Sequence, residues 1–174
     1  NTAAQIAFKA LKKILNTDFE ISICGMLENG FFIDFKTSQS ISSNDFLKIE
    51  KEMKKIISSG DKIEIIKDLK LNKYQNLQKE ESNDFNFIKI GKDFENISFF
   101  EIEDNVNKVK FFKLTNIGGA YWQNNSSLDQ LTRLSGVAFD TKKELEEWDA
   151  LQEEIKKRDH RKIGQDMEIF AFSN

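Results

Sequence analysis

Short apolar runs separated by turn-forming residues constrain the fold most. Two such runs within residues 21–35 flank Asn29-Gly30. That dipeptide is the strongest short-range signal of a β-hairpin, because a type I′ turn needs positive φ at both central positions. Later runs rich in phenylalanine and isoleucine predict strands at 63–66, 85–90, 97–102, 109–114 and 130–139. We expect the three runs between residues 85 and 114 to share one antiparallel sheet.

Three other segments have apolar residues at helical spacing, which predicts amphipathic helices. The first presents Ala3, Ala7, Leu11, Ile14 and Leu15. The second is capped by Ser42 or Ser43, ends near Gly60, and presents Phe46, Ile49, Met53, Ile56 and Ile57. The third starts at a capping box, Thr141 to Glu144, ends in the charged run 156–162, and presents Leu145, Trp148, Leu151 and Ile155.

Helices interspersed among hairpin strands predict an α+β fold, an antiparallel sheet with hairpins packed against a few helices. Neither a G-x-G-x-x-G fingerprint nor a P-loop occurs in the sequence. Residues 68–83 are polar and weakly helical, so we expect them at the surface. A length of 174 residues, 39% of them hydrophobic, suits one domain, or one domain and an appendage.

Charge and cysteine content exclude several classes of function. With 26 basic and 29 acidic residues the net charge is −3, so an autonomous, tight nucleic-acid binder is excluded and any RNA contact is local or shared with another domain. Cys24 is the single cysteine, which excludes an internal disulfide and a cysteine zinc cage. No apolar stretch is long enough for a membrane span and no signal peptide occurs, so we expect a cytoplasmic protein.

Two blocks in the second half of the chain carry a family resemblance. The first runs from Phe112-Lys113-Leu114 through Gly119-Ala120-Tyr121-Trp122 to Leu131, Arg133, Gly136, Ala138 and Phe139. The second is the run KRDHRKIG at 157–164. Both resemble threonyl-tRNA synthetases, in the editing domain and in the linker to the catalytic domain, and residues 29–34 are similar to the hairpin of that editing domain. This resemblance implies the fold of the editing domain that threonyl- and alanyl-tRNA synthetases share.

The resemblance implies a hydrolytic site for seryl-tRNA. A threonine pocket tolerates serine, because one missing methyl group changes binding by only about 1–3 kcal/mol. In the family, histidines on the opening helix and a Cys-x-x-x-His loop surround the ester, and an imidazole can activate water near neutral pH. At the aligned helix positions this chain has amides and an ammonium, and residues 101–110 form a shorter loop with neither cysteine nor histidine. We expect a degenerate editing pocket, with no catalytic residue and no metal ligand, formed by Asn1, Gln5, Lys9, Phe32, Ile33 and Asp34.

Other chemistry-bearing residues have two interpretations each. Lys9 is either a solvated lysine or a desolvated base with a lowered pKa, and we favour the first. Cys24 is either a nucleophile or a residue of the hydrophobic core, and we favour the core. The single histidine, His160, is more consistent with a phosphate or domain contact than with acid–base catalysis.

A set of aromatic and basic residues is expected to contact either tRNA or a neighbouring domain. The aromatic pair suits a domain interface better than RNA stacking, and a solvated helix face is the alternative for the basic run. The set comprises Lys113, Tyr121, Trp122, Arg133, Lys157, Arg158, His160, Arg161 and Lys162.

The leading hypothesis is a fragment of a threonyl-tRNA synthetase whose editing domain no longer hydrolyses seryl-tRNA but supports the enzyme and positions the tRNA acceptor stem. The alternative is an active deacylase in which Gln5, Lys9 and either Asp34 or Asp104 position the water. The domains expected are 1–152 for editing, 153–165 for a linker helix and 166–174 for the start of the aminoacylation domain. The resemblance implies that ATP, magnesium and zinc bind only in that catalytic domain, that tRNA is a partner, and that the full-length protein is a homodimer.

Overall fold

The computed structural model describes residues 1–16, 22–66, 85–121 and 130–172. Helices and strands alternate along the chain without a regular βαβ repeat, which confirms the predicted α+β class. The elements are α1 (Thr2–Leu15), β1 (Ser22–Leu27), β2 (Gly30–Phe35), η1 (Ser43–Asp45), α2 (Phe46–Ser59), β3 (Ile63–Ile66), β4 (Asn86–Ile90), β5 (Phe94–Ser98), η3 (Val106–Lys108), β6 (Phe111–Tyr121), β7 (Gln130–Phe139) and α3 (Lys142–Phe172).

The strands form two antiparallel sheets, in the orders β1-β2-β7-β6 and β3-β4-β5. The prediction that the runs from 85 to 114 share one sheet is therefore wrong, since β4 pairs with β5 whereas β6 pairs with β7. A turn at Gly91, whose φ is 65°, starts β5 earlier than predicted, at Phe94. After Ser98 the chain leaves the sheet, and the Ser98 hydroxyl donates to the carbonyl of Phe100 at 2.7 Å.

The first hairpin is confirmed, but its turn lies one residue earlier than predicted. Leu27 pairs with Gly30, so the two turn residues are Glu28 and Asn29. Neither Asn29 nor Gly30 has a positive φ. Gly30 is instead required by close packing, because a Cβ there would collide with the carbonyl oxygen of Gly136 on β7. The dipeptide therefore predicted the hairpin correctly, but its glycine is needed for packing against β7 and not for a type I′ turn.

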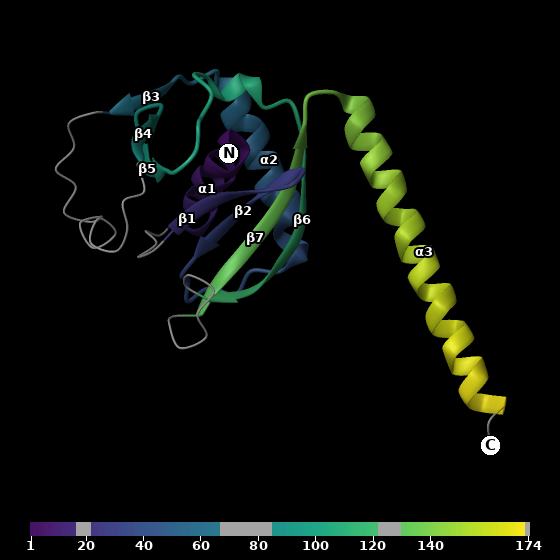
Figure 1. Cartoon of the computed structure of the whole chain (residues 1–174). Coiled ribbons are helices and arrows are strands. Elements are labelled where there is room, and N and C mark those ends of the chain that lie inside the picture. The colour runs from purple at the N-terminus through teal and green to yellow at the C-terminus, as the bar shows by residue number, and fades with distance from the viewer. Residues whose placement is uncertain (17–21, 67–84, 122–129, 173–174) are drawn as a thin grey trace.

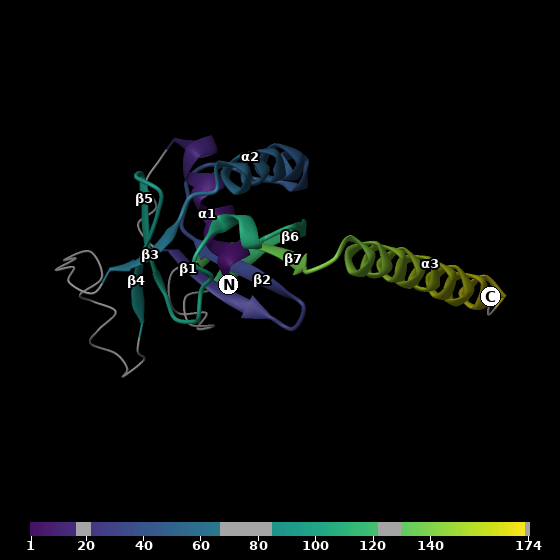
Figure 2. The ribbon, with the colours of Figure 1, turned by 90° about the horizontal axis from the view of Figure 1, so that it is seen from above.

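Helices α1 and α2 cover one face of the four-stranded sheet, and the three-stranded sheet lies beside them (Figures 1 and 2). Helix α1 is buried along Thr2–Leu11, which is more of its circumference than one apolar stripe predicts. Helix α2 buries Ile49, Met53 and Ile56, as predicted. Ser42 forms a capping box with Asp45, and Gly60 ends α2 in the left-handed conformation.

The third helix leaves the body of the protein and extends away from it (Figures 1 and 2). Its capping box is confirmed: Thr141 N donates to Glu144 Oε2 at 3.1 Å, and Glu144 N donates to Thr141 Oγ1 at 3.2 Å. The helix does not end in the run 156–162 but continues to Phe172. No proline occurs to stop it, and the one glycine beyond the run costs only about 1 kcal/mol.

Helix α3 runs without a break through both predicted domain boundaries, at 152 and 165, and the boundaries stay predictions. The expected surface segment 68–83 lies outside the described residues, as does Trp122. Among the described helices, none is both long enough and apolar enough to cross a membrane.

Candidate functional site: the face of α1 beside β4 and β5

Asn1, Gln5 and Lys9 share one flank of α1, as their spacing predicts, and all three contact the second sheet or the chain next to it. Asn1 Nδ2 donates to the Ser98 hydroxyl at 2.6 Å. Gln5 Nε2 donates to the carbonyl of Ile97 at 3.0 Å, and Gln5 Oε1 accepts from Asn96 Nδ2 at 2.8 Å. Both ends of the Gln5 amide are therefore occupied by β5.

Lys9 is buried, so the expectation of a solvated lysine is wrong. Its ammonium lies 2.9 Å from Asp93 Oδ1 and 3.4 Å from Asp61 Oδ2, and it donates to the carbonyl of Ile90 at 3.2 Å. Asp61 lies between α2 and β3, Ile90 is the last residue of β4, and Asp93 lies in the turn between β4 and β5. The hydrogen bond from Lys9 holds the pKa of Asp93 below its usual range. The ammonium is an ion-pair anchor between α1 and two loops.

The segment that follows β5 lies at the N-terminal end of α1. The backbone N–H of Glu103 donates to the Thr2 hydroxyl at 3.0 Å, and Asn1 Nδ2 donates to the carbonyl of Phe100 at 3.3 Å. Ile63 N donates to the carbonyl of Asp104, which ties the same segment to β3. The loop that the resemblance implies at this site is therefore next to Asn1, while its Glu103 and Asp104 side chains are exposed.

Asp34 is the second-last residue of β2 and forms an ion pair with Arg133 on the adjacent strand β7. Both carboxylate oxygens accept from the guanidinium, each at 2.7 Å. The hydrogen bonds that Arg133 donates to Asp34 raise the pKa of the guanidinium. The ring of Phe32 lies 4.2 Å from Arg133 Cζ, a cation–π contact. Ile33 faces the opposite side of β2 and is fully buried.

The predicted pocket residues therefore do not form one site. Asn1, Gln5 and Lys9 line the contact between α1 and the second sheet, whereas Phe32 and Asp34 share a face of the first sheet with Arg133. Lys9 and Asp34, which the deacylase alternative brings together, have different ion-pair partners.

Cys24 lies in the core, as predicted, with 2% of its surface exposed. Burial raises the pKa of its thiol, which disfavours the nucleophilic thiolate. Asn96 Nδ2 lies 3.9 Å from the sulfur. The thiol is a packing group between β1 and β5.

The residues expected to contact tRNA or another domain fall into two groups. Lys113 and Arg133 already have carboxylate partners: Lys113 pairs with Asp149 of α3 at 2.7 Å, and Arg133 pairs with Asp34. The α3 residues Lys157, Arg158, His160, Arg161 and Lys162 are exposed. The side chains of Tyr121 and Trp122 lie outside the described residues.

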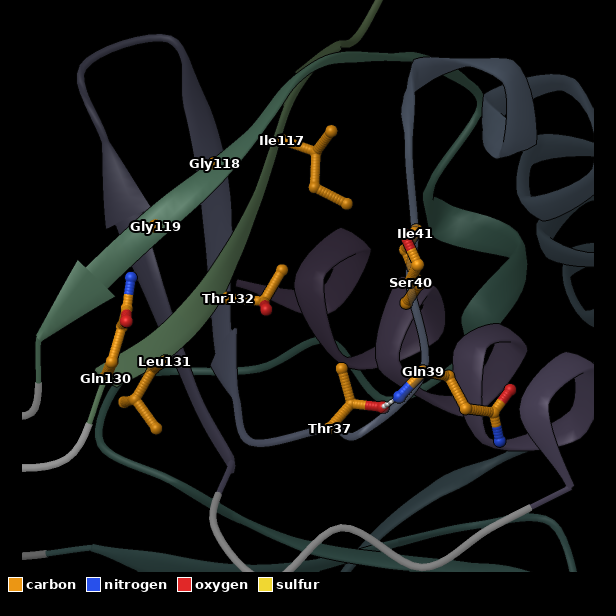
Figure 3. A pocket seen from close by; sticks show the side chains of 10 residues that line it. All are labelled: Thr37, Gln39, Ser40, Ile41, Ile117, Gly118, Gly119, Gln130, Leu131 and Thr132. Carbon is orange, nitrogen blue, oxygen red and sulfur yellow. Dashed lines mark hydrogen bonds between the residues drawn. The ribbon is translucent and has the colours of Figure 1, made fainter.

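A separate pocket of about 420 Å³ opens beside the end of β6 (Figure 3). Uncharged polar side chains dominate its lining, among them Thr37, Gln39, Gln130 and Thr132. Gln39 donates to the carbonyl of Leu15 at the end of α1. The pocket is thus at the opposite end of α1 from Asn1, and sequence reasoning did not find it because none of its residues carries a catalytic signature.

Sequence reasoning also missed the partners that occupy the α1 flank, namely Asn96, Asp61 and Asp93. An asparagine within the apolar run 94–98 was a usable signal for Asn96, since a buried amide requires a partner. No signal marked the two aspartates, which lie in turns. Among the described residues, no group of three or more histidine, cysteine, aspartate or glutamate side chains is placed to hold a metal ion.

No protein-family model matches the chain. It is 33% identical to the threonine–tRNA ligase of Oceanobacillus iheyensis over 186 residues, which cover 99% of this chain and 28% of that protein. It is 34% identical to threonine–tRNA ligase 1 of Bacillus subtilis over 195 residues, covering 99% of the chain and 29% of the relative. The ligase of Clostridioides difficile is 36% identical over 183 residues, with coverage of 98% and 28%.

The chain spans less than a third of the length of these relatives. The matched stretches are longer than the 174 residues of this chain, so the relatives carry internal residues that it lacks. The chain is thus related over nearly its whole length to threonine–tRNA ligases, and it corresponds to a segment of them.

Proposed function

We propose that the chain is the editing domain of a threonine–tRNA ligase in a degenerate form, which does not hydrolyse seryl-tRNA. It contributes to the architecture of the enzyme and to the position of the tRNA acceptor stem. The catalytic steps that need ATP, magnesium or zinc belong to the remainder of the ligase, which is a homodimer.

One observation carries the proposal: the side chains of Gln5 and Lys9 on the α1 flank are committed to the protein itself. The Gln5 amide is bound at both ends by β5, and the Lys9 ammonium is held by Asp93 and Asp61. A general base must reach a water with a free lone pair at the pH of reaction. An amide is not basic enough, and the Lys9 ammonium is already engaged by two carboxylates and the carbonyl of Ile90, so neither group is free to activate water.

The single histidine supports the same conclusion. His160 is on α3, which extends away from the body, whereas the α1 flank is enclosed by the two sheets (Figure 1). The imidazole is exposed among basic side chains, where it suits a contact with phosphate or another domain. The exposed α3 residues are accordingly the part of the chain that we assign to tRNA.

The test is a deacylation assay. Threonine-specific tRNA charged with labelled serine is incubated with the 174-residue chain, and serine release is compared with the spontaneous rate. We expect the two rates to be equal. Brief alkaline treatment, which cleaves every aminoacyl ester, controls for substrate quality, and release clearly above the spontaneous rate would refute the proposal.

The alternative function, a deacylase that uses Lys9 and Asp34, makes a different prediction in the same assay. Release should then exceed the spontaneous rate and fall in the variants Lys9→Met and Asp34→Asn. Circular dichroism of both variants controls for loss of fold. Equal rates for the chain and both variants, none above the spontaneous one, would exclude this alternative.

A further inference from the structure

The polar pocket beside the end of β6 has two walls that come from distant parts of the chain. One wall is the segment 37–41, which follows β2, and the other consists of residues 117–119 of β6 and 130–132 of β7 (Figure 3). Its volume of about 420 Å³ lies within the range of small-molecule sites, about 300–1,000 Å³. The pocket is at the start of β7, whereas α3 follows the other end of that strand (Figure 1). It is therefore distinct from both α3 and the α1 flank.

Gly119 keeps this space open. It is the registered partner of Thr132 across β6 and β7, so side chains at the two positions project to the same face of the sheet. Its φ is not in the left-handed region, and the backbone therefore does not require glycine there. Among the described residues, the atom nearest to a Cβ at Gly119 would be Gln130 Nε2, at 3.3 Å, which ends a flexible side chain. A larger residue fits the strand but would occupy the space beside Thr132.

Polar groups on both walls retain hydrogen-bonding capacity. The Thr37 hydroxyl accepts from the backbone N–H of Gln39 at 3.1 Å (Figure 3), and its own proton remains to donate. Gln39 Nε2 donates to the carbonyl of Leu15 at 3.2 Å, which leaves the amide oxygen as an acceptor. On the other wall, no hydrogen bond within the described part of the chain engages the side chains of Gln130 and Thr132. Donors and acceptors therefore face the pocket from both sides.

The lining indicates an uncharged ligand. None of the described residues around the pocket has a charged side chain, and Ile41, Ile117 and Leu131 add apolar contact. A phosphate, carboxylate or ammonium group that entered would lose water without gaining a counter-charge, which is unfavourable. Proteins commonly hold phosphates with lysine or arginine. Amino acids and nucleotides are thus poor matches, whereas a neutral molecule with several donors and acceptors is a good one.

We propose that this pocket binds an uncharged nucleoside. A glutamine carboxamide forms a pair of hydrogen bonds with the N6 and N7 edge of adenine, and Gln130 supplies one. Ribose hydroxyls both donate and accept, as do those of Thr37 and Thr132. The apolar faces of the base suit Ile117 and Leu131. The proposal does not rest on the loss of hydrolysis at the α1 flank, because the two sites share no residue.

A titration of the ¹⁵N-labelled 174-residue chain with adenosine, followed by two-dimensional NMR, tests the proposal. We expect saturable shifts centred on residues 37–41, 117–119 and 130–132, with a dissociation constant on the order of 0.1–1 mM. Adenosine 5′-monophosphate should bind at least about threefold more weakly, because its phosphate finds no counter-charge. The absence of saturable shifts with adenosine, or binding of the monophosphate or of ribose as tight as that of adenosine, would overturn the proposal.

Two variants test the place of binding. Gly119→Val should abolish the adenosine shifts, because its side chain fills the space beside Thr132. Gln130→Leu, which keeps the size of the side chain, should raise the dissociation constant by about tenfold. The matched control is Gln152→Leu on α3, outside the pocket, and it should leave the constant unchanged. The dispersion of the NMR spectrum controls for folding, and unchanged affinity in a folded Gly119→Val chain would place adenosine elsewhere and refute the assignment.

Discussion

Arg133 and Asp34 face each other as registered partners on β7 and β2, and their side chains join through two hydrogen bonds of 2.7 Å. The carboxylate is 9% exposed and the guanidinium 32% exposed. The pair is therefore partly removed from water, and it links the two central strands across one position of their register. Phe32 packs over the guanidinium from the same face.

Removal of the guanidinium should leave the buried carboxylate without a partner. We expect Arg133→Ala to lower the free energy of unfolding by about 3 kcal/mol, the low end for buried pairs, because Arg133 is partly solvated. Urea denaturation followed by circular dichroism measures the change.

A matched control for this loss is Lys142→Ala, which breaks the exposed pair with Glu146 and should change the free energy of unfolding by less than about 1 kcal/mol. If the loss of stability in Arg133→Ala comes from the unpaired buried charge of Asp34, the double variant Arg133→Ala, Asp34→Leu should be more stable than Arg133→Ala alone. If the double variant were as unstable as the sum of the two single variants, the carboxylate would not be the source of the cost.

Local patterns in the sequence were sufficient for most elements. The strands 63–66 and 130–139 were predicted with their observed bounds, and the caps at Ser42, Gly60 and Thr141 are where the sequence placed them. Each of these signals involves residues close together in the chain. The assignment of β6 to the first sheet was missed, because its pairing with β7 depends on residues distant in sequence.

The same distinction explains what was missed at the candidate site. Helical spacing was enough to put Asn1, Gln5 and Lys9 on one flank. It did not reveal what that flank touches, since the partners of Lys9 lie 52 residues away at Asp61 and beyond it at Asp93. Burial of a lysine depends on such partners, and the sequence alone therefore favoured a solvated one.

Gly30 is required by packing between β2 and β7. A Cβ at this position would collide with the backbone carbonyl of Gly136, and neither strand can move without disturbing the ladder. We expect Gly30→Ala to lower the free energy of unfolding by about 2 kcal/mol or more, a typical cost of overpacking. Gly118→Ala on β6, where nothing lies within 4 Å of the added Cβ, is the matched control and should be nearly neutral in the same urea titration.

The Gln5 amide joins α1 to β5, and its loss should remove one hydrogen bond from each of two polar groups on β5. In Gln5→Leu the buried side chain of Asn96 loses its 2.8 Å acceptor and the carbonyl of Ile97 loses its donor. We expect a loss of about 1–3 kcal/mol in the free energy of unfolding, at about 0.5–1.5 kcal/mol for each hydrogen bond removed. Gln39→Leu, which removes an exposed bond to the Leu15 carbonyl, is the control. Equal losses for the two variants would mean that the amide of Gln5 does not hold the sheets together.

Asp93 should make part of the stability dependent on pH. Its pKa is lowered in the folded chain, chiefly by the hydrogen bond from Lys9. The carboxylate therefore stabilises the fold fully above its unfolded value, about 3.9, and this contribution is lost as the pH falls through the folded value. Because Asp93 is 61% exposed, solvent screening makes the effect small.

Urea midpoints of the chain and of Asp93→Asn should thus differ at neutral pH and converge below the folded pKa. The difference should also shrink when Lys9→Met is present in both, since the Lys9 ammonium is the main cause of the lowered pKa. A difference that persisted in strong acid would assign the effect of Asp93→Asn to the turn at Gly91 rather than to the ion pair.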